Sequence, residues 1–174
     1  MTETWGASDG TPITIRPITA ADFGLEQEFV SRLSPASGYQ RLMSARPLSA
    51  EEIRRFTDID YEHEMALIAT TSVDGRERQI GVARYVKDES AAGDAEFAIV
   101  LSDDWQARGL GTKLLASLLA AARAQGVRRV VATTLSPNNA MLALARRLGF
   151  TLAPNSAAPS ITNLTLELAE TRRP

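Results

Sequence analysis

Residues 95–126 read AEFAIVLSDDWQARGLGTKLLASLLAAARAQG and place an apolar strand, a glycine-containing loop and a long helix in direct succession. Residues 95–101 are almost wholly apolar, which predicts a strand in the middle of a sheet. Residues 110–125 are rich in leucine and alanine, and Gly126 is a typical helix terminator. The stretch therefore predicts a strand–loop–helix unit whose loop lies at the helix N-terminus.

The loop from Gln106 to Thr112 is suited to hold a diphosphate. Backbone N–H groups of such a turn can point at one ligand, and the helix dipole adds about half a positive charge there. Gly109 and Gly111 let phosphate oxygens approach the backbone, while Arg108 offers a guanidinium and Thr112 a hydroxyl. The spacing matches neither a P-loop nor a dinucleotide-binding motif. Taken alone, the loop is equally consistent with a plain helix entry that contains turn glycines.

The rest of the chain predicts a mixed fold around this unit. Strands are expected over residues 13–16, 65–71, 79–86, 95–101, 129–135, 150–152 and 161–168, with a turn at Val73–Gly75. Helices are expected over residues 19–33, 49–56, 110–125 and 138–148, with a capping box at Ser49 and Glu52. This order predicts an α/β (α+β) fold, with a mostly antiparallel sheet of about six to seven strands and about four helices. Residues 1–11 are polar and are expected to be a flexible N-terminus before a single domain over residues 12–170.

The composition argues against several classes of function. The 174 residues are 44% hydrophobic and 23% charged, which suits one domain with a sizeable core. A net charge of −2 argues against nucleic-acid binding, which needs a basic surplus. With no cysteine and His63 as the single histidine, no metal site is expected. The N-terminus does not look like a signal peptide and no apolar run approaches ~20 residues, which predicts a cytoplasmic protein without a membrane span.

Two motifs together resemble the GNAT acetyltransferases. Gln106-x-x-Gly109-x-Gly111, between a strand and a helix, resembles that family's R/Q-x-x-G-x-G/A motif. Residues 138–150, NNAMLALARRLGF, resemble its second signature, a helix that ends in Gly-Phe. The resemblance spans residues 13–168 and is most specific to the acetyltransferase domain of bacterial Pat-type protein lysine acetyltransferases, through residues 16–35, 64–69 and 95–111.

The resemblance implies acetyl-CoA as co-substrate and no metal. It implies that the strands 95–101 and 129–135 are parallel neighbours that splay into a V-shaped gap for the pantetheine arm, with the pyrophosphate on the loop. The residues then expected to bind acetyl-CoA are Ile99, Val100, Leu101, Gln106, Ala107, Arg108, Gly109, Leu110, Gly111, Thr112 and Asn138. The family builds its acceptor site from the region that contains Tyr39, Arg41 and Met43; these side chains are equally consistent with a surface cover of the sheet.

Glu96 is the candidate general base. It is the one charged residue in AEFAIVL and lies beside the expected cofactor gap. Burial there would raise its pKa and suit it to proton abstraction, and the Pat-type resemblance implies this role. The alternative is a solvent-facing glutamate satisfied by a neighbour such as Arg84.

Two other positions bear on the chemistry. Many GNAT enzymes carry a general-acid tyrosine four residues before the Gly-Phe pair, where this chain has Ala145. Three alternatives remain open: water protonates the leaving thiolate, the thiolate leaves unprotonated, or Tyr61 or Tyr85 takes the tyrosine's place in space. His63 has acidic neighbours, so we expect it in a solvated segment and assign it no catalytic role.

Three hypotheses about function follow. The first is an enzyme that acetylates a protein lysine, and the second is an enzyme of the same fold that acts on a small-molecule amine. The third is a non-catalytic module that senses acyl-CoA. The sequence identifies neither the acceptor nor the oligomeric state, monomer or homodimer.

Overall fold

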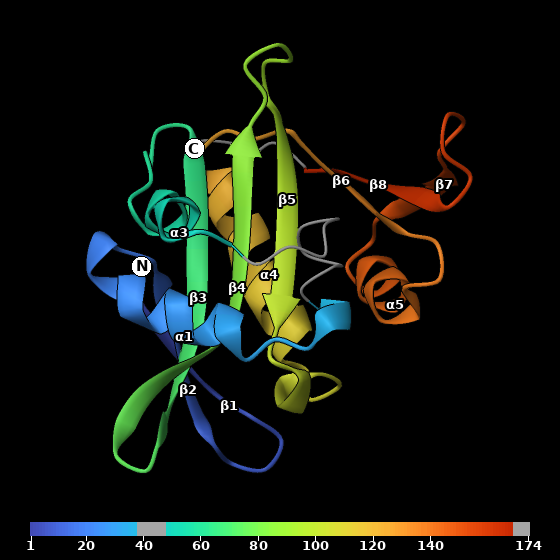
Figure 1. The fold of residues 1–174 in the computed structure, drawn as a ribbon. Helices are drawn as coiled ribbons and strands as arrows, with labels where there is room; N and C mark the ends of the chain where they lie inside the picture. The colour runs from blue at the N-terminus through green and yellow to red at the C-terminus, as the bar shows by residue number, and fades with distance from the viewer. Residues whose placement is uncertain (38–47, 169–174) are drawn as a thin grey trace, which may run out of the picture.

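One sheet organises the molecule in the computed structural model, which describes residues 1–37 and 48–168 (Figure 1). Within these residues the sheet has eight strands in the order β1-β2-β3-β4-β5-β6-β8-β7. The strands are β1 (Glu3–Gly6), β2 (Pro12–Pro17), β3 (Glu64–Val73), β4 (Arg76–Lys87), β5 (Asp94–Leu101), β6 (Arg129–Leu135), β7 (Thr151–Pro154) and β8 (Ile161–Glu167). Neighbouring strands are antiparallel except β5 and β6, which are parallel. The predicted mostly antiparallel sheet with one parallel pair is therefore confirmed, with β5 near its middle.

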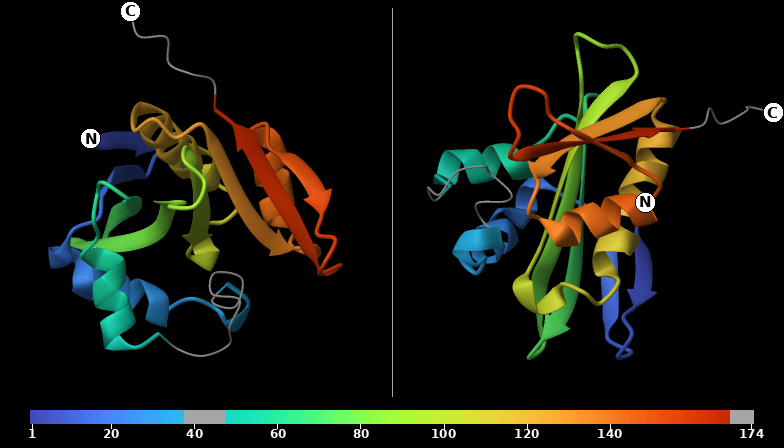
Figure 2. Two further views of the ribbon diagram at one scale, coloured as in Figure 1. Left: turned by 90° about the horizontal axis from the view of Figure 1, so that it is seen from above. Right: turned by 90° about the vertical axis from the view of Figure 1, so that its right-hand side faces the viewer.

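Helices cover both faces of this sheet (Figures 1 and 2). Those described are α1 (Phe23–Ser31), α3 (Ala50–Thr57), α4 (Leu110–Ala124) and α5 (Asn139–Arg147), with short 3-10 turns η1 (Ala20–Asp22) and η2 (Asp103–Trp105). Helices α4 and α5 pack over the larger hydrophobic core, whereas α1 contributes Phe29 to a smaller core on the opposite face. Because the middle of β3 faces both cores, with Leu67 in one and Ile68 in the other, residues 65–69 are apolar without interruption.

Short sequence motifs correctly predicted where several strands and helices begin or end. Asp74 and Gly75 both have positive φ, 52° and 75°, as a two-residue type I′ turn between antiparallel strands requires. The predicted capping box is present: the Glu52 N–H donates to Ser49 Oγ over 3.2 Å and the Ser49 N–H donates to Glu52 Oε2 over 2.8 Å. These features need only neighbouring residues, which is why the sequence predicts them.

The N-terminal segment differs from the prediction. Residues 1–11 were expected to be loose, yet Glu3–Gly6 form β1 and pair antiparallel with β2, which brings the sheet to eight strands. Trp5 packs against the larger core, and Glu3 accepts hydrogen bonds from Lys113 Nζ, at 2.7 Å, and from the Ser117 hydroxyl. A strand of four residues carries little periodic signal, and contacts with α4 hold it in place.

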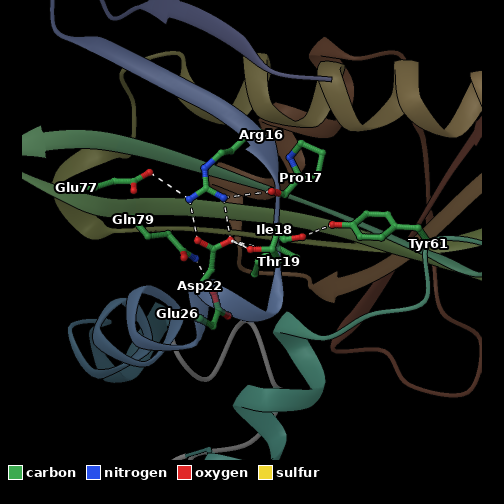
Figure 3. A network of polar contacts seen from close by, with 9 residues as sticks. All are labelled: Arg16, Pro17, Ile18, Thr19, Asp22, Glu26, Tyr61, Glu77 and Gln79. Atoms are coloured by element: carbon green, nitrogen blue, oxygen red, sulfur yellow. Dashed lines mark hydrogen bonds and ion pairs between the residues drawn. The ribbon is translucent and has the colours of Figure 1, made fainter.

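A polar network joins the end of β2 to the start of α1 (Figure 3). Arg16 donates two hydrogen bonds of 2.8 Å to the carboxylate of Asp22, which is 4% exposed. The same carboxylate accepts a bond of 2.8 Å from the Thr19 N–H. Burial opposes ionisation of Asp22, but the bonds from Arg16 and Thr19 outweigh it and lower its pKa. The network therefore holds α1 against the sheet.

Among the described residues, every helix is too short or too polar to cross a lipid bilayer.

Candidate active site

The parallel strands β5 and β6 separate part-way along their length. They are in register at only three positions, Asp94↔Arg129, Ala95↔Val130 and Glu96↔Val131. Beyond Glu96, β5 pairs with β4 alone, and beyond Val131, β6 pairs with β8 alone. A cavity of about 580 Å³ occupies the resulting gap.

The cavity brings together most of the predicted cofactor residues. Those that line it are Ile99, Val100, Leu101, Gln106, Ala107, Gly109, Gly111, Thr112 and Asn138. Leu110 does not line it, because its side chain is fully buried in the larger core. Arg108 does not line it either: its guanidinium lies over the Trp105 ring, 5.0 Å from the centroid, and Nη1 donates to Asp9 Oδ2 over 3.2 Å.

The loop at one end of the cavity brings the N-terminus of α4 to it. Gly109 is the N-cap of α4, and no side chain in the described part of the chain caps that helix. The first backbone N–H groups of the helix therefore keep no intrahelical acceptor and carry the positive end of the dipole. Gly109 has φ +85°, and Ala107, although not glycine, has φ 59°. Such left-handed residues turn successive N–H groups toward one point, which is the geometry of an anion-binding nest.

Helix α5 forms the opposite wall. Asn138 caps the helix: Oδ1 accepts from the Met141 N–H over 3.2 Å, and Nδ2 donates to Thr134 Oγ1 over 3.1 Å. The side of α5 that faces the cavity also carries residues that we did not predict: Ala140, Met141, Ala143, Leu144 and Arg147. Their spacing of three to four residues is helical, and that periodicity is the signal that could have identified them.

Glu96 lines the cavity at the point where strand pairing ends. The expectation that Glu96 is buried was wrong, because its side chain is exposed. Residues alternate along β5, so Ala95 and Phe97 enter the larger core while Glu96 points to the opposite face beside exposed Val86, its register partner on β4. Helices α1 and α3 lie over the β3 side of that face (Figure 1). Among the described residues, none makes an ion pair or hydrogen bond to the Glu96 side chain. Arg84, which the sequence suggested as a partner of Glu96, instead donates to the Phe56 carbonyl over 2.9 Å.

Known proteins share this architecture. Residues 13–151 match the model of the acetyltransferase (GNAT) domain family. The chain belongs to the GNAT acetyltransferases. It is 34% identical over 143 residues to Acetyltransferase PA5475 of Pseudomonas aeruginosa. The aligned region covers 82% of this chain and 76% of that protein. It is 30% identical over 135 residues to Acetyltransferase Pat of Mycolicibacterium smegmatis, covering 78% of this chain but 40% of Pat.

Solved structures agree with the family assignment. The GNAT domain of S. lividans PAT superposes with a TM-score of 0.86 at 30% identity, covering 96% of this chain and 97% of that domain. A GNAT phosphinothricin acetyltransferase from Sinorhizobium meliloti, solved with AcCoA, gives a TM-score of 0.73 at 25% identity, covering 93% and 92%. The chain is therefore an acetyltransferase, with the mixed sheet and parallel pair of its family.

Tyr61 and Tyr85 were the candidates to replace the general-acid tyrosine that many GNAT enzymes have. Ala145 is fully buried in the larger core. Tyr85 is also in that core, where burial raises its pKa to about 12. Tyr61 donates from its hydroxyl to the Ile18 carbonyl. Neither tyrosine lines the cavity. Neither Tyr61 nor Tyr85 is therefore placed to protonate a leaving thiolate.

Four residues that the sequence analysis singled out remain: three expected acceptor contacts and His63. Tyr39, Arg41 and Met43, the expected acceptor contacts, are outside the described residues. His63 is exposed and does not line the cavity, and its Nδ1 lies 2.6 Å from Asp60 Oδ2. The hydrogen bond with Asp60 raises the pKa of His63. The expectation of a solvated position for His63 is confirmed.

Proposed function

We propose that this GNAT acetyltransferase transfers the acetyl group of acetyl-CoA to a primary amine, and that this amine is the side chain of a protein lysine. Glu96 is the proposed general base. One observation carries the proposal: the gap between β5 and β6 joins the uncapped N-terminus of α4 at one end to Glu96 at the other. A diphosphate and a reacting amine thus have separate places along one continuous cavity.

The cofactor fits the residues that are present. The first N–H groups of α4, with the left-handed Ala107 and Gly109, would hold the pyrophosphate. The backbone of β5 beyond Glu96 has no strand partner on the β6 side, so an extended pantetheine arm can pair with it near Ile99–Leu101. Asn138 lines the same stretch, and its amide is already oriented by Thr134.

The amine must lose a proton before it can attack. A free lysine has a pKa of about 10.4, so deprotonation near pH 7 costs about 4–5 kcal/mol. Glu96 would accept that proton, directly or through a water, and its exposed position leaves it open to an incoming side chain. Acetyl-CoA supplies the activated acyl group as a thioester, and a backbone N–H near Leu101 would polarise its carbonyl. Because the pKa of a thiol is about 8–9, the CoA thiolate can leave unprotonated or take a proton from water.

The choice of a protein lysine rests on the Pat-type relatives. Both the sequence strings of residues 16–35 and 95–111 and the TM-score of 0.86 to the S. lividans PAT domain favour it. A small-molecule amine is the second candidate, favoured by the similarity to the phosphinothricin acetyltransferase of S. meliloti. A non-catalytic acyl-CoA sensor would need no base at the cavity, and Glu96 argues against it.

The test is CoA-thiol release from acetyl-CoA by the purified protein, with two classes of acceptor. One class is a bacterial acetyl-CoA synthetase, with acetyl-lysine read by mass spectrometry; the other is a panel of amino acids, polyamines and phosphinothricin. Lysine-specific release supports the first proposal, and release with one small amine alone supports the second. Tight acetyl-CoA binding without release by any acceptor would support the sensor, and no binding at all would overturn the whole proposal.

A further inference from the structure

A carboxylate just before the cofactor loop binds a distant segment of the chain. Asp103 lies in η2, between β5 and the loop. Its Oδ1 accepts from Ser37 Oγ over 2.7 Å and from Ser34 Oγ over 3.0 Å, and its Oδ2 accepts from the Ser34 N–H over 3.1 Å. Both serines follow α1, so Asp103 ties the segment after that helix to the segment before the loop.

The two serines form the start of a helical turn. Residues Pro35–Ser37 are helical, and Ser34 Oγ accepts from the Ser37 N–H over 3.2 Å, as an N-cap residue does. In a capping box the N-cap N–H is satisfied by an acidic side chain three residues later in the same helix. Here Ser37 stands at that position, and Asp103, 69 residues away from Ser34, supplies the carboxylate. The conformation of residues 34–37 therefore depends on a residue beside the cofactor loop.

The same contacts reach the cavity. Ser37 is 5% exposed and lines the cavity together with Gln106. Gln106 Nε2 donates over 3.3 Å to Ser37 Oγ and makes longer contacts with Asp103 Oδ1, at 3.4 Å, and the Leu101 carbonyl, at 3.5 Å. The Ser37 hydroxyl thus donates to Asp103 and accepts from Gln106. A short chain of hydrogen bonds connects Asp103 to two residues of the cavity wall.

A carboxylate is well suited to this position. It accepts several hydrogen bonds and donates none, whereas an asparagine offers one oxygen and an N–H₂ group that would face the donors of the serines. The bond from Ser37 is the main cause that lowers the pKa of Asp103, with bonds from Ser34 in the same direction and burial opposing them. The side chain consequently stays ionised at neutral pH.

We propose that Asp103 is a positioning residue that couples the wall on the α1 side of the active site to the cofactor loop, through Ser37 and Gln106. The proposal rests on the proposed function above, because it assigns the two walls to acceptor and cofactor. Asp103 touches neither substrate. It holds Ser37 and Gln106 in one arrangement, so disturbing it should weaken the binding of both substrates and leave the chemical step at Glu96 intact.

The first experiment compares Asp103→Asn with Asp104→Asn by calorimetric titration with acetyl-CoA. Asp103 and Asp104 are adjacent exposed carboxylates, so both variants lose the same charge at nearly the same place. We expect Asp103→Asn to raise the Kd by about tenfold, since it loses charge-assisted hydrogen bonds, and Asp104→Asn to change it by less than about twofold. Equal Kd values for the two variants would overturn the proposal.

The second experiment separates positioning from general loss of structure. With the acceptor found by thiol release, Asp103→Asn should raise the acceptor KM by about tenfold while kcat stays within about threefold. Ser37→Ala should also raise the KM, and the double variant should be no worse than Asp103→Asn alone, because both residues act through the same chain of hydrogen bonds. A fall in kcat at unchanged KM, or effects that multiply, would contradict the coupling.

The outcomes also separate this inference from the proposed function. If wild-type protein binds acetyl-CoA but no amine releases thiol, the catalytic proposal fails and the calorimetric comparison still tests Asp103. If Asp103→Asn does not fold, as judged by its unfolding transition, Ser37→Ala and Ser37→Thr carry the test. The threonine keeps a hydroxyl and should restore the Kd that the alanine loses; a Kd unchanged by Ser37→Ala would overturn the proposal.

Discussion

Glu96 and Val131 are the last residues in register between β5 and β6, and the cavity opens directly after them. The pair therefore marks the boundary between a hydrogen-bonded sheet and a gap with unpaired strand edges. A carboxylate at this boundary is held by a regular strand while its side chain stays exposed. Rigid backbone and open access are both useful to a group that must meet an incoming amine.

Replacing that carboxylate should separate binding from turnover. We expect Glu96→Gln to lower the rate of thiol release by about 10²–10⁴-fold, because the variant cannot accept the proton of the amine. Acetyl-CoA affinity, measured by calorimetry, should change by less than about twofold. Glu89→Gln, at an exposed position in the loop before β5, is the matched control and should keep full activity. Unchanged turnover in Glu96→Gln would remove Glu96 from the mechanism.

The two glycines of the loop should respond differently to alanine. Gly109 has φ +85°, where a Cβ costs about 1–2 kcal/mol, and its Cβ would meet Trp5 only at an ordinary distance of 3.7 Å. Gly109→Ala should therefore lower the free energy of unfolding by about 1 kcal/mol through backbone strain, and weaken acetyl-CoA binding. Urea unfolding and calorimetry measure the two effects.

Gly111→Ala is the control for the same substitution in helical backbone. Alanine is the better helix former by about 0.5–1 kcal/mol, which offsets a Cβ contact of 3.4 Å to Leu101 Cδ1. We expect its stability within about 0.5 kcal/mol of wild type. If Gly111→Ala were as destabilised as Gly109→Ala, then steric crowding by the added Cβ, and not the positive φ of Gly109, would explain the loss of stability.

The N-terminal strand should support the cofactor loop. Trp5 packs against the larger core and lies near Gly109, and Glu3 on the same strand binds Lys113 of α4. Trp5→Ala should destabilise the protein by about 2 kcal/mol, less than a fully buried tryptophan because Trp5 is half-buried. It should also weaken acetyl-CoA binding, measured on protein shown to be folded by circular dichroism. Trp5→Phe should retain most of both properties, and wild-type stability in Trp5→Ala would show that β1 contributes little.

His63 should titrate above the usual value for histidine. The hydrogen bond with Asp60 favours the imidazolium and raises the pKa of His63 above 6.5. Because the folded pKa is the higher one, the stabilising contribution is complete below about 6.5 and disappears as the pH rises through the folded value. The chain has one histidine, so NMR of its ring signals gives the titration directly. Asp60→Asn should lower this pKa, and a wild-type value at or below 6.5 would contradict the bond.

The sequence by itself determined the features that depend on neighbouring residues. The turn at Asp74–Gly75, the capping box of Ser49 and Glu52 and the helix that follows Gly109 are each encoded within a few residues. Strand and helix periodicity placed β5 and α4 for the same reason, since alternation and 3.6-residue spacing are local properties. The candidate cofactor loop could be singled out from the sequence because its motif lies wholly within this strand–loop–helix unit.

The tertiary structure alone decided where side chains meet. It turned Arg108 toward Asp9, 99 residues away in sequence, and joined Asp103 to Ser37, 66 residues away. It also ordered β1 against β2 and left Glu96 exposed where burial was expected. No local pattern encodes such pairings, because they depend on how distant segments pack against the two faces of one sheet.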